Sequence, residues 1–196
     1  MKTKKYWFLA VVIGVFALQL WAGFDIKKLT LKQQSLVGID AMYVSVDELP
    51  KNAKEAGLTK RQIQTDIELK LRREGIKVVT SQEEWLKLSG SPYLFVTIQS
   101  LKLEELPVFA YSITVELKQG VFLMRNRNIS NLATTWNEHR VGCAGEKVFV
   151  SSTRRYVSDF VDIFLNDYLA ANPKEPDVWE RAAKELREKA AKEKDE

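Results

Sequence analysis

An apolar stretch near the N-terminus is the feature that most limits what this chain can fold into. Residues 6–24 are apolar except for Gln19, and three lysines stand among the five residues before them. Positive charge ahead of an apolar run holds the N-terminus in the cytoplasm and sends the following chain across the membrane. We therefore expect residues 1–23 to be a signal peptide or an N-terminal membrane anchor, and the rest to fold outside the cytoplasm.

The sequence leaves open whether this segment is cleaved. A cut after Ala22 places Leu20 and Ala22 at the two positions where small residues are preferred, and Leu20 fits that pattern poorly. At about 1.5 Å per residue, a helix over residues 6–24 is also nearly long enough to cross a bilayer core of about 30 Å. Cleavage would leave a periplasmic domain, whereas an uncleaved transmembrane helix would anchor that domain to the inner membrane.

Composition argues against several classes of function. The formal net charge is +4, and subtracting Lys2, Lys4 and Lys5 leaves only +1 for the rest of the chain. A nearly neutral body lacks the basic stripe that neutralises phosphates, so we expect no nucleic-acid partner. Cys143 is the only cysteine, which excludes an internal disulfide and is more typical of a bacterial than of a eukaryotic extracytoplasmic protein.

Alternation of apolar and polar residues predicts the strands. It is clearest over residues 111–117 and continues past Gly120, a candidate bulge, to Leu123, with a polar turn at 125–128. The same kind of pattern predicts further strands at 36–46, 76–80, 93–103 and 132–141.

Capping signals and a period near 3.6 residues predict the helices. Thr59 with Gln62 reads as a capping box, the apolar residues that follow are spaced four apart, and Gly75 marks the end of that helix. Ser81 opens a second, short helix in the same way. A long helix opens at Ser151 or Ser152 and ends before Asn172-Pro173, with apolar residues at 157, 160, 161, 164, 165, 168 and 169.

The resulting order, β-α-β-short α-β-β-β-α, predicts an α+β fold. We expect two layers, with one mixed, mostly antiparallel sheet of about five strands and two main helices on one of its faces. The single domain would span residues 36–173, after a connector at 24–35. The charge-rich residues 174–196 would form a helical or disordered tail.

No residues stand out as a catalytic, cofactor-binding or metal-binding set. His139 is the only histidine, and on a strand it would lie about 13 Å from Cys143, although a turn near Gly142 could bring the two together. Zinc needs three or four ligands, more than one histidine and one cysteine supply. We expect a surface histidine and a half-buried thiol.

Other charged and polar groups are expected to be solvated. Asp159 and Asp162 share a helical face without calcium-loop spacing, and Arg154-Arg155 would lie in the first turn of the long helix. If only one face of the sheet is covered, the other presents a polar surface that could serve for docking, formed by Thr97, Gln99, Ser112, Thr114 and Glu116.

Several segments resemble a family of uncharacterised exported bacterial proteins. The segments are residues 44–50, 57–59, 68–76, 92–94 and 166–173, so the similarity spans most of residues 38–173. These segments carry the fold rather than a site, and the resemblance implies export and no activity. The order of elements is also loosely similar to small periplasmic domains of envelope transport assemblies, an analogy of fold alone.

Three hypotheses about function follow. The first is a non-catalytic envelope module that binds an envelope protein or the membrane surface. The second is an extracytoplasmic hydrolase that uses carboxylates or the His139 and Cys143 region, and the third is an oligomeric scaffold joined through the charged tail. The sequence favours the first and leaves the oligomeric state open.

Overall fold

The computed structural model describes residues 26–173. The expected signal peptide or anchor at 1–23 and the expected tail at 174–196 lie outside the described residues. Within residues 26–173, no helix is long and apolar enough to cross a membrane.

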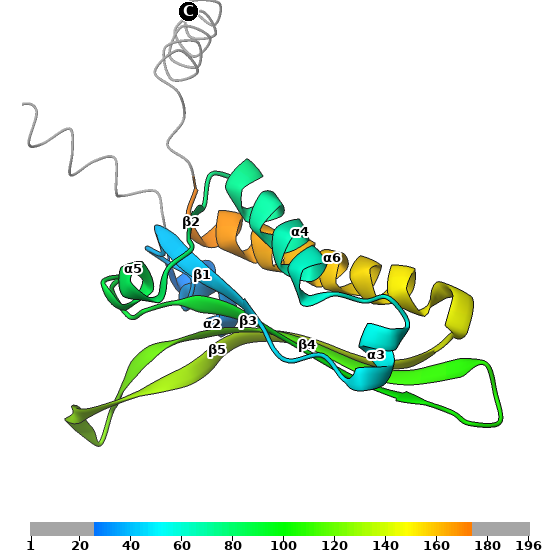
Figure 1. Cartoon of the computed structure of the whole chain (residues 1–196). Helices are drawn as coiled ribbons and strands as arrows, with labels where there is room; N and C mark the ends of the chain where they lie inside the picture. The colour runs from blue at the N-terminus through cyan, green and yellow to red at the C-terminus, as the bar shows by residue number, and fades with distance from the viewer. Residues whose placement is uncertain (1–25, 174–196) are drawn as a thin grey trace, which may run out of the picture.

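One five-stranded mixed sheet organises the domain and confirms the predicted α+β class (Figure 1). Its order is β2-β1-β3-β4-β5, with β1 parallel to both β2 and β3, and with β3, β4 and β5 forming an antiparallel meander. The strands are β1 (Ala41–Val46), β2 (Lys77–Val79), β3 (Tyr93–Lys102), β4 (Val108–Leu123) and β5 (Asn126–Gly145).

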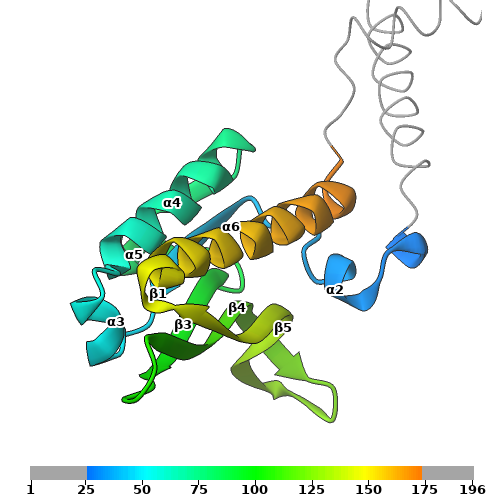
Figure 2. The same cartoon turned by 90° about the vertical axis from the view of Figure 1, so that its right-hand side faces the viewer.

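Two long helices, α4 (Lys60–Arg73) and α6 (Glu146–Ala171), lie side by side over one face of this sheet (Figure 2). The predicted signals frame α4: the Thr59 hydroxyl accepts a hydrogen bond from the Gln62 amide, and Gly75 has a φ of +87°. The shorter helices are η1 (Ile26–Lys28), α2 (Leu31–Gln34), α3 (Lys51–Glu55) and α5 (Gln82–Leu86).

The core lies between the two helices and the covered face of the sheet. Every second residue of β4 from Phe109 to Leu117 is buried, as the alternation predicts, and so are Ile63, Ile67 and Leu71 of α4. Trp136 of β5 is 1% exposed, meets Phe164 of α6 edge to face, and donates its indole N–H to Asp167 over 2.9 Å. The sheet and α6 are therefore joined by packing and by a charge-assisted hydrogen bond.

The boundary between β5 and α6 differs from the prediction. The strand runs through Gly142 to Gly145, and α6 begins at once at Glu146 rather than at Ser151 or Ser152. Gly145 has no side chain to cap the helix, so the sequence carried no start signal there. Phe149 fixes this first turn because it is fully buried and stacks on Phe109 with ring centroids 4.2 Å apart.

The predicted bulge at Gly120 is wrong in position. The register between β4 and β5 shifts instead between Leu117 and Lys118 and again between Phe122 and Leu123. At the first shift Thr135 is the extra residue; its carbonyl accepts a hydrogen bond from the Ser35 hydroxyl, and its own hydroxyl accepts one from Gln119. The bulge therefore lies where Ser35 and Gln119 can bind Thr135.

Two other strand boundaries also differ from the prediction. The first strand begins at Ala41 rather than at residue 36, because the backbone at Leu36 and Gly38 is bound by the Asn172 side chain at the end of α6. The turn before β5 is at Met124 and Arg125, so β5 begins at Asn126 within the predicted polar turn.

The described part of the predicted connector is folded onto the sheet. Thr30 and Gln33 form a complete capping box at the start of α2. Lys32 then donates to the Asn137 carbonyl over 2.7 Å and pairs with Glu138 over 2.8 Å. The chain therefore enters the domain beside the middle of β5.

Candidate functional site: the β4–β5 arm and the outer edge of β5

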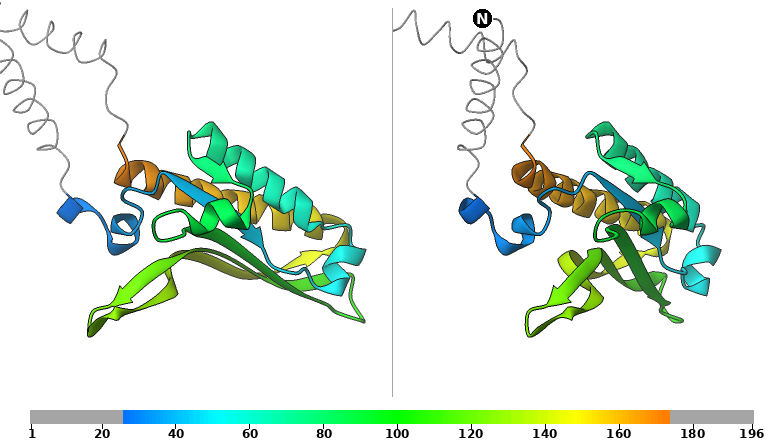
Figure 3. Two further views of the ribbon diagram at one scale, coloured as in Figure 1. Left: turned by 60° about the vertical axis from the view of Figure 1, so that its left-hand side comes forward. Right: turned by 90° about the vertical axis from the view of Figure 1, so that its left-hand side faces the viewer.

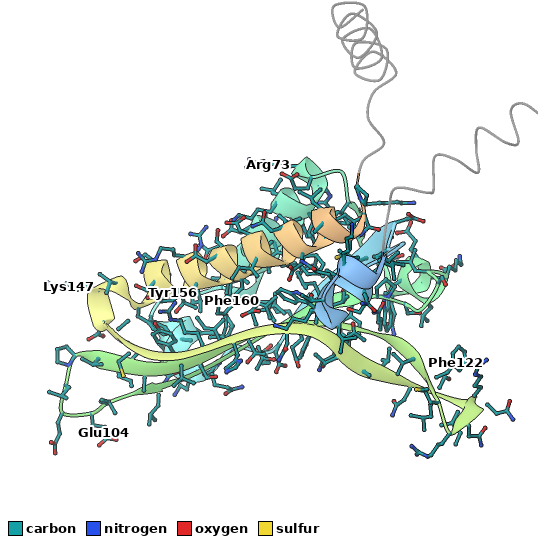
Figure 4. All side chains as sticks on the ribbon, turned by 180° about the vertical axis from the view of Figure 1, so that it is seen from behind. Arg73, Glu104, Phe122, Lys147, Tyr156 and Phe160 are labelled. Carbon is teal, nitrogen blue, oxygen red and sulfur yellow. The ribbon has the colours of Figure 1, made fainter. Side chains whose placement is uncertain are left out.

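The β4–β5 hairpin extends past the core as a two-stranded arm. We define the arm as residues 119–134, beyond the first register shift; Figure 4 labels Phe122 near its end. Met124 is 99% exposed and Phe122 is 69% exposed, and Ile129 and Leu132 are exposed as well. No helix covers the arm in the described part of the chain (Figure 1). The arm is therefore an apolar projection into solvent.

Both faces of the arm carry apolar residues. Register pairs Gly120 with Leu132 and Phe122 with Ser130, which places Phe122 and Leu132 on one face. Val121 and Leu123 alternate onto the other face and are only half-buried. An isolated two-stranded ribbon is marginally stable in water, so apolar side chains on both faces favour a binding partner.

All charged side chains of the arm are positive. Arg125 and Arg127 lie at its tip, and residues 119–134 contain no aspartate or glutamate. At the other end of β4, the loop to β3 instead carries Glu104 and Glu105, both exposed (Figure 4). The two ends of β4 therefore differ in charge, whereas both expose apolar side chains, Leu101 and Leu106 at the loop end.

The arm projects from the end of the domain at which the chain enters. Gln119, at the base of the arm, donates to the Ser35 carbonyl just after α2, and η1 and the arm lie at the same end of the molecule (Figure 3). Leu31 of α2 is 83% exposed there, and Ile26 of η1 is also exposed. The described chain thus begins, at Ile26, at the end of the domain that carries the arm.

The uncovered face of the sheet is only partly polar. Register places Thr97 beside Thr114 and Gln99 beside Ser112, as the alternation predicts. Near β1, however, four aromatic residues form a cluster closed by α5, with ring centroids 5.4–6.3 Å apart: Tyr43, Trp85, Tyr93 and Phe95. Sequence reasoning missed this cluster, because its members come from three separate elements.

A basic and aromatic cluster flanks the outer edge of β5 on the helix side. The Arg140 guanidinium lies 4.1 Å from the centre of the Tyr156 ring, and that of Arg155 lies 5.1 Å from it. The Tyr111 ring is 6.1 Å from Tyr156 and reaches past Gly142, where a Cβ would lie only 2.8 Å from the Tyr111 hydroxyl oxygen. Because position 142 has no side chain, the Tyr111 ring can pack beside it within this cluster.

The pKa values of the two tyrosines in this cluster are shifted in opposite directions. Hydrogen bonding from Arg155 lowers the pKa of Tyr156, and Tyr111 and the charge of Arg140 lower it further. Burial raises the pKa of Tyr111, and the neighbouring Tyr156 adds to that rise. The difference follows from solvent access and from the guanidinium groups around Tyr156.

The residues considered for catalysis are not brought together. His139 and Cys143 both lie on exposed positions of β5, opposite Thr114 and Ala110, which keeps them about four strand positions or roughly 13 Å apart. The expected half-burial of the thiol is wrong, since Cys143 is exposed. Among residues 26–173, no three His, Cys, Asp or Glu side chains are placed to share a metal ion.

Two of the four charged residues singled out on α6, Arg154 and Asp162, form ion pairs with α4. Asp162 binds Lys70, and Arg154 donates to Asp66 from both Nε and Nη2, over 3.0 and 2.7 Å. The predicted place of Arg154 in the first turn is wrong, because α6 begins at Glu146; Arg154 lies further along the helix, paired with Asp66 and still 40% exposed. These pairs join the two helices.

Comparison with known proteins adds little to this picture. No family model matches the sequence, and no curated protein matches it. The fold is similar to that of the PelC L103M dodecamer from Paraburkholderia phytofirmans, at a TM-score of 0.38 and 11% identity over 67% of this chain and 91% of that chain. It is also similar to the hypothetical protein CT253 from Chlamydia trachomatis, at a TM-score of 0.39 and 11% identity over 66% of this chain and 99% of that chain. Likenesses this distant support no functional assignment.

Proposed function

We propose that this chain is a non-catalytic, extracytoplasmic module of the cell envelope, whose arm lies against an anionic membrane surface. The observation that carries the proposal is the uncovered apolar and cationic arm, at the end of the domain where the described chain begins, after the apolar segment 6–24 in the sequence. The lysines ahead of that segment and the resemblance to exported proteins support the location.

The composition of the arm suits a lipid interface. Full burial of a side chain such as Phe122 or Met124 contributes about 1.5–3 kcal/mol each. Arg125 and Arg127 can bury their stems and keep the guanidinium groups among the headgroups, where each cation near an anionic surface adds about 1 kcal/mol. The loop with Glu104 and Glu105 would be repelled by the same surface, so the long axis of the domain would have one preferred orientation.

The test places a dye on the arm of the full chain in lipid vesicles. In a Cys143→Ser background, Met124→Cys carries an environment-sensitive fluorophore, and Glu104→Cys carries it in the matched control. On vesicles of phosphatidylglycerol and phosphatidylcholine, we expect blue-shifted emission and quenching by spin-labelled lipid at position 124 and neither at 104. Adding Arg125→Glu and Arg127→Glu should reduce the effect at position 124.

Two results would overturn the proposal. The first is equal solvent exposure of the dye at both positions on anionic vesicles. The second is a dye at position 124 that is exposed on lipid vesicles but shielded in native membranes, which would assign the arm to an envelope protein instead.

A further inference from the structure

The outer edge of β5 is covered over only part of its length. Because β5 is the last strand of the sheet, its outer backbone groups have no strand to pair with. The Ser35 hydroxyl and the Lys32 ammonium bind the carbonyls of Thr135 and Asn137, so α2 covers this stretch. Within residues 26–173, no backbone group from outside β4 binds β5 at residues 139–143.

Alternation shows which backbone groups are free there. The Asn137 carbonyl points away from β4, because Lys32 binds it from outside the sheet. The register from Trp136 to Gly145 has no further shift, so every second residue repeats this orientation. The N–H and C=O groups of His139, Val141 and Cys143 therefore face outward, in the pattern that an added strand requires.

Two positive charges lie beside this free edge. Arg140 and Arg155 both pack on Tyr156, and neither has a carboxylate within 4.0 Å among the described residues. Asp159, one helical turn after Arg155, is exposed and pairs with neither. The half-buried Tyr156 hydroxyl, which accepts a hydrogen bond from Arg155, adds a hydrogen-bond donor at the same place.

From these two observations we infer that residues 139–143 accept an extended segment of a partner protein as a sixth strand, and that this segment carries an acidic side chain bound by Arg140 and Arg155. The inference does not rest on the proposed membrane contact, since it uses a different surface. A second copy of this chain fits less well, because pairing through the same edge would bring like guanidinium groups together.

The side chains on the two faces of β5 predict the sequence pattern of the bound segment. On the helix side, the added strand would place its acidic residue beside Arg140 and the Tyr156 hydroxyl. On the open face it would lie beside Val141, which is 76% exposed, and Cys143, which is also exposed. Since successive side chains of a strand point to opposite faces, the segment should alternate apolar and acidic residues.

The test measures binding of labelled octapeptides to the full chain in phosphatidylcholine nanodiscs. One peptide alternates Val and Glu; the first control alternates Val and Lys, and the second has the Val and Glu residues in adjacent pairs. We expect only the alternating Val and Glu peptide to bind, by fluorescence anisotropy, and to slow amide hydrogen exchange at His139 and Val141.

Three variants locate the peptide. Arg140→Ala with Arg155→Ala should weaken binding by about tenfold or more. Val141→Pro should do the same, because proline removes an outward N–H that the β4 ladder does not use. Arg61→Ala, which removes an exposed cation of α4, should leave binding unchanged. Slow exchange at Val115 and Leu117 checks that each variant is folded.

Four outcomes of the peptide experiments would overturn the inference. They are no binding of the alternating Val and Glu peptide at millimolar concentration, equal binding of either control peptide, a folded Val141→Pro variant that binds normally, and exchange protection away from β5. Dimerisation in sedimentation that Val141→Pro abolishes would also overturn it, by assigning the edge to a second copy.

Discussion

Replacement of Gly142 by alanine should destabilise the domain by crowding Tyr111. A Cβ at position 142 would lie 2.8 Å from the Tyr111 hydroxyl oxygen and 3.0 Å from its Cζ, both below ordinary van der Waals contact. Crowding of this kind costs about 1–3 kcal/mol, and the lower backbone entropy of alanine in the unfolded chain offsets about 0.4–1 kcal/mol of it. We expect a net loss of about 1–2 kcal/mol, since Gly142 has no positive φ that alanine would strain.

Urea denaturation of the full chain in detergent micelles, followed by tryptophan fluorescence, would measure this loss as a lower midpoint at unchanged m-value. In a Tyr111→Phe background the hydroxyl is gone, so Gly142→Ala should cost about 1 kcal/mol less there. Equal costs in the two backgrounds, or no cost at all, would refute the placement of Tyr111 against Gly142.

Four further predictions concern packing and charge. Trp136→Phe should lower the free energy of unfolding by about 2–3 kcal/mol, because it removes the hydrogen bond to Asp167 and leaves a cavity; Asp167→Asn, which keeps an acceptor, should cost less in the same denaturation assay. Arg154 and Asp66, both about 40% exposed, should show a coupling energy below about 1 kcal/mol in a double-mutant cycle, and a larger value would contradict the assignment of a solvent-screened pair. Ultraviolet titration should show Tyr156 ionising before an ordinary tyrosine and Tyr111 after it, with Arg155→Ala moving Tyr156 upward. The folded state raises the pKa of Tyr111 and so disfavours its anion. The contribution of Tyr111 to the free energy of unfolding is therefore complete below about pH 10 and is lost as the pH rises through the folded pKa. A free energy of unfolding that stays constant over this pH range would contradict this.

Much of the core was predictable because side-chain direction follows from local geometry. The alternation over residues 111–117 identified the buried face of β4, and the spacing of Ile63, Ile67 and Leu71 identified that of α4. Thr59 and Gly75 marked the ends of α4 because capping depends on neighbouring residues alone.

The candidate surfaces were not predictable in the same way. Phe122 and Leu123 continue the alternation of β4. Nothing in that pattern indicates that the helices covering the sheet end before the arm. Arg140, Tyr111 and Tyr156 meet only through the pairing of β4 with β5 and the packing of α6. The sequence allowed a turn near Gly142, whereas the contact that explains this glycine comes from Tyr111, 31 positions earlier in the chain.

Hydrogen exchange of the full chain on anionic vesicles is the most direct test that the arm contacts the membrane. We expect peptides covering residues 119–134 to exchange more slowly on vesicles of phosphatidylglycerol and phosphatidylcholine than in detergent, while residues 103–107, at the other end of β4, exchange equally in both. Unchanged exchange of the arm, or equal protection at both ends, would contradict this account.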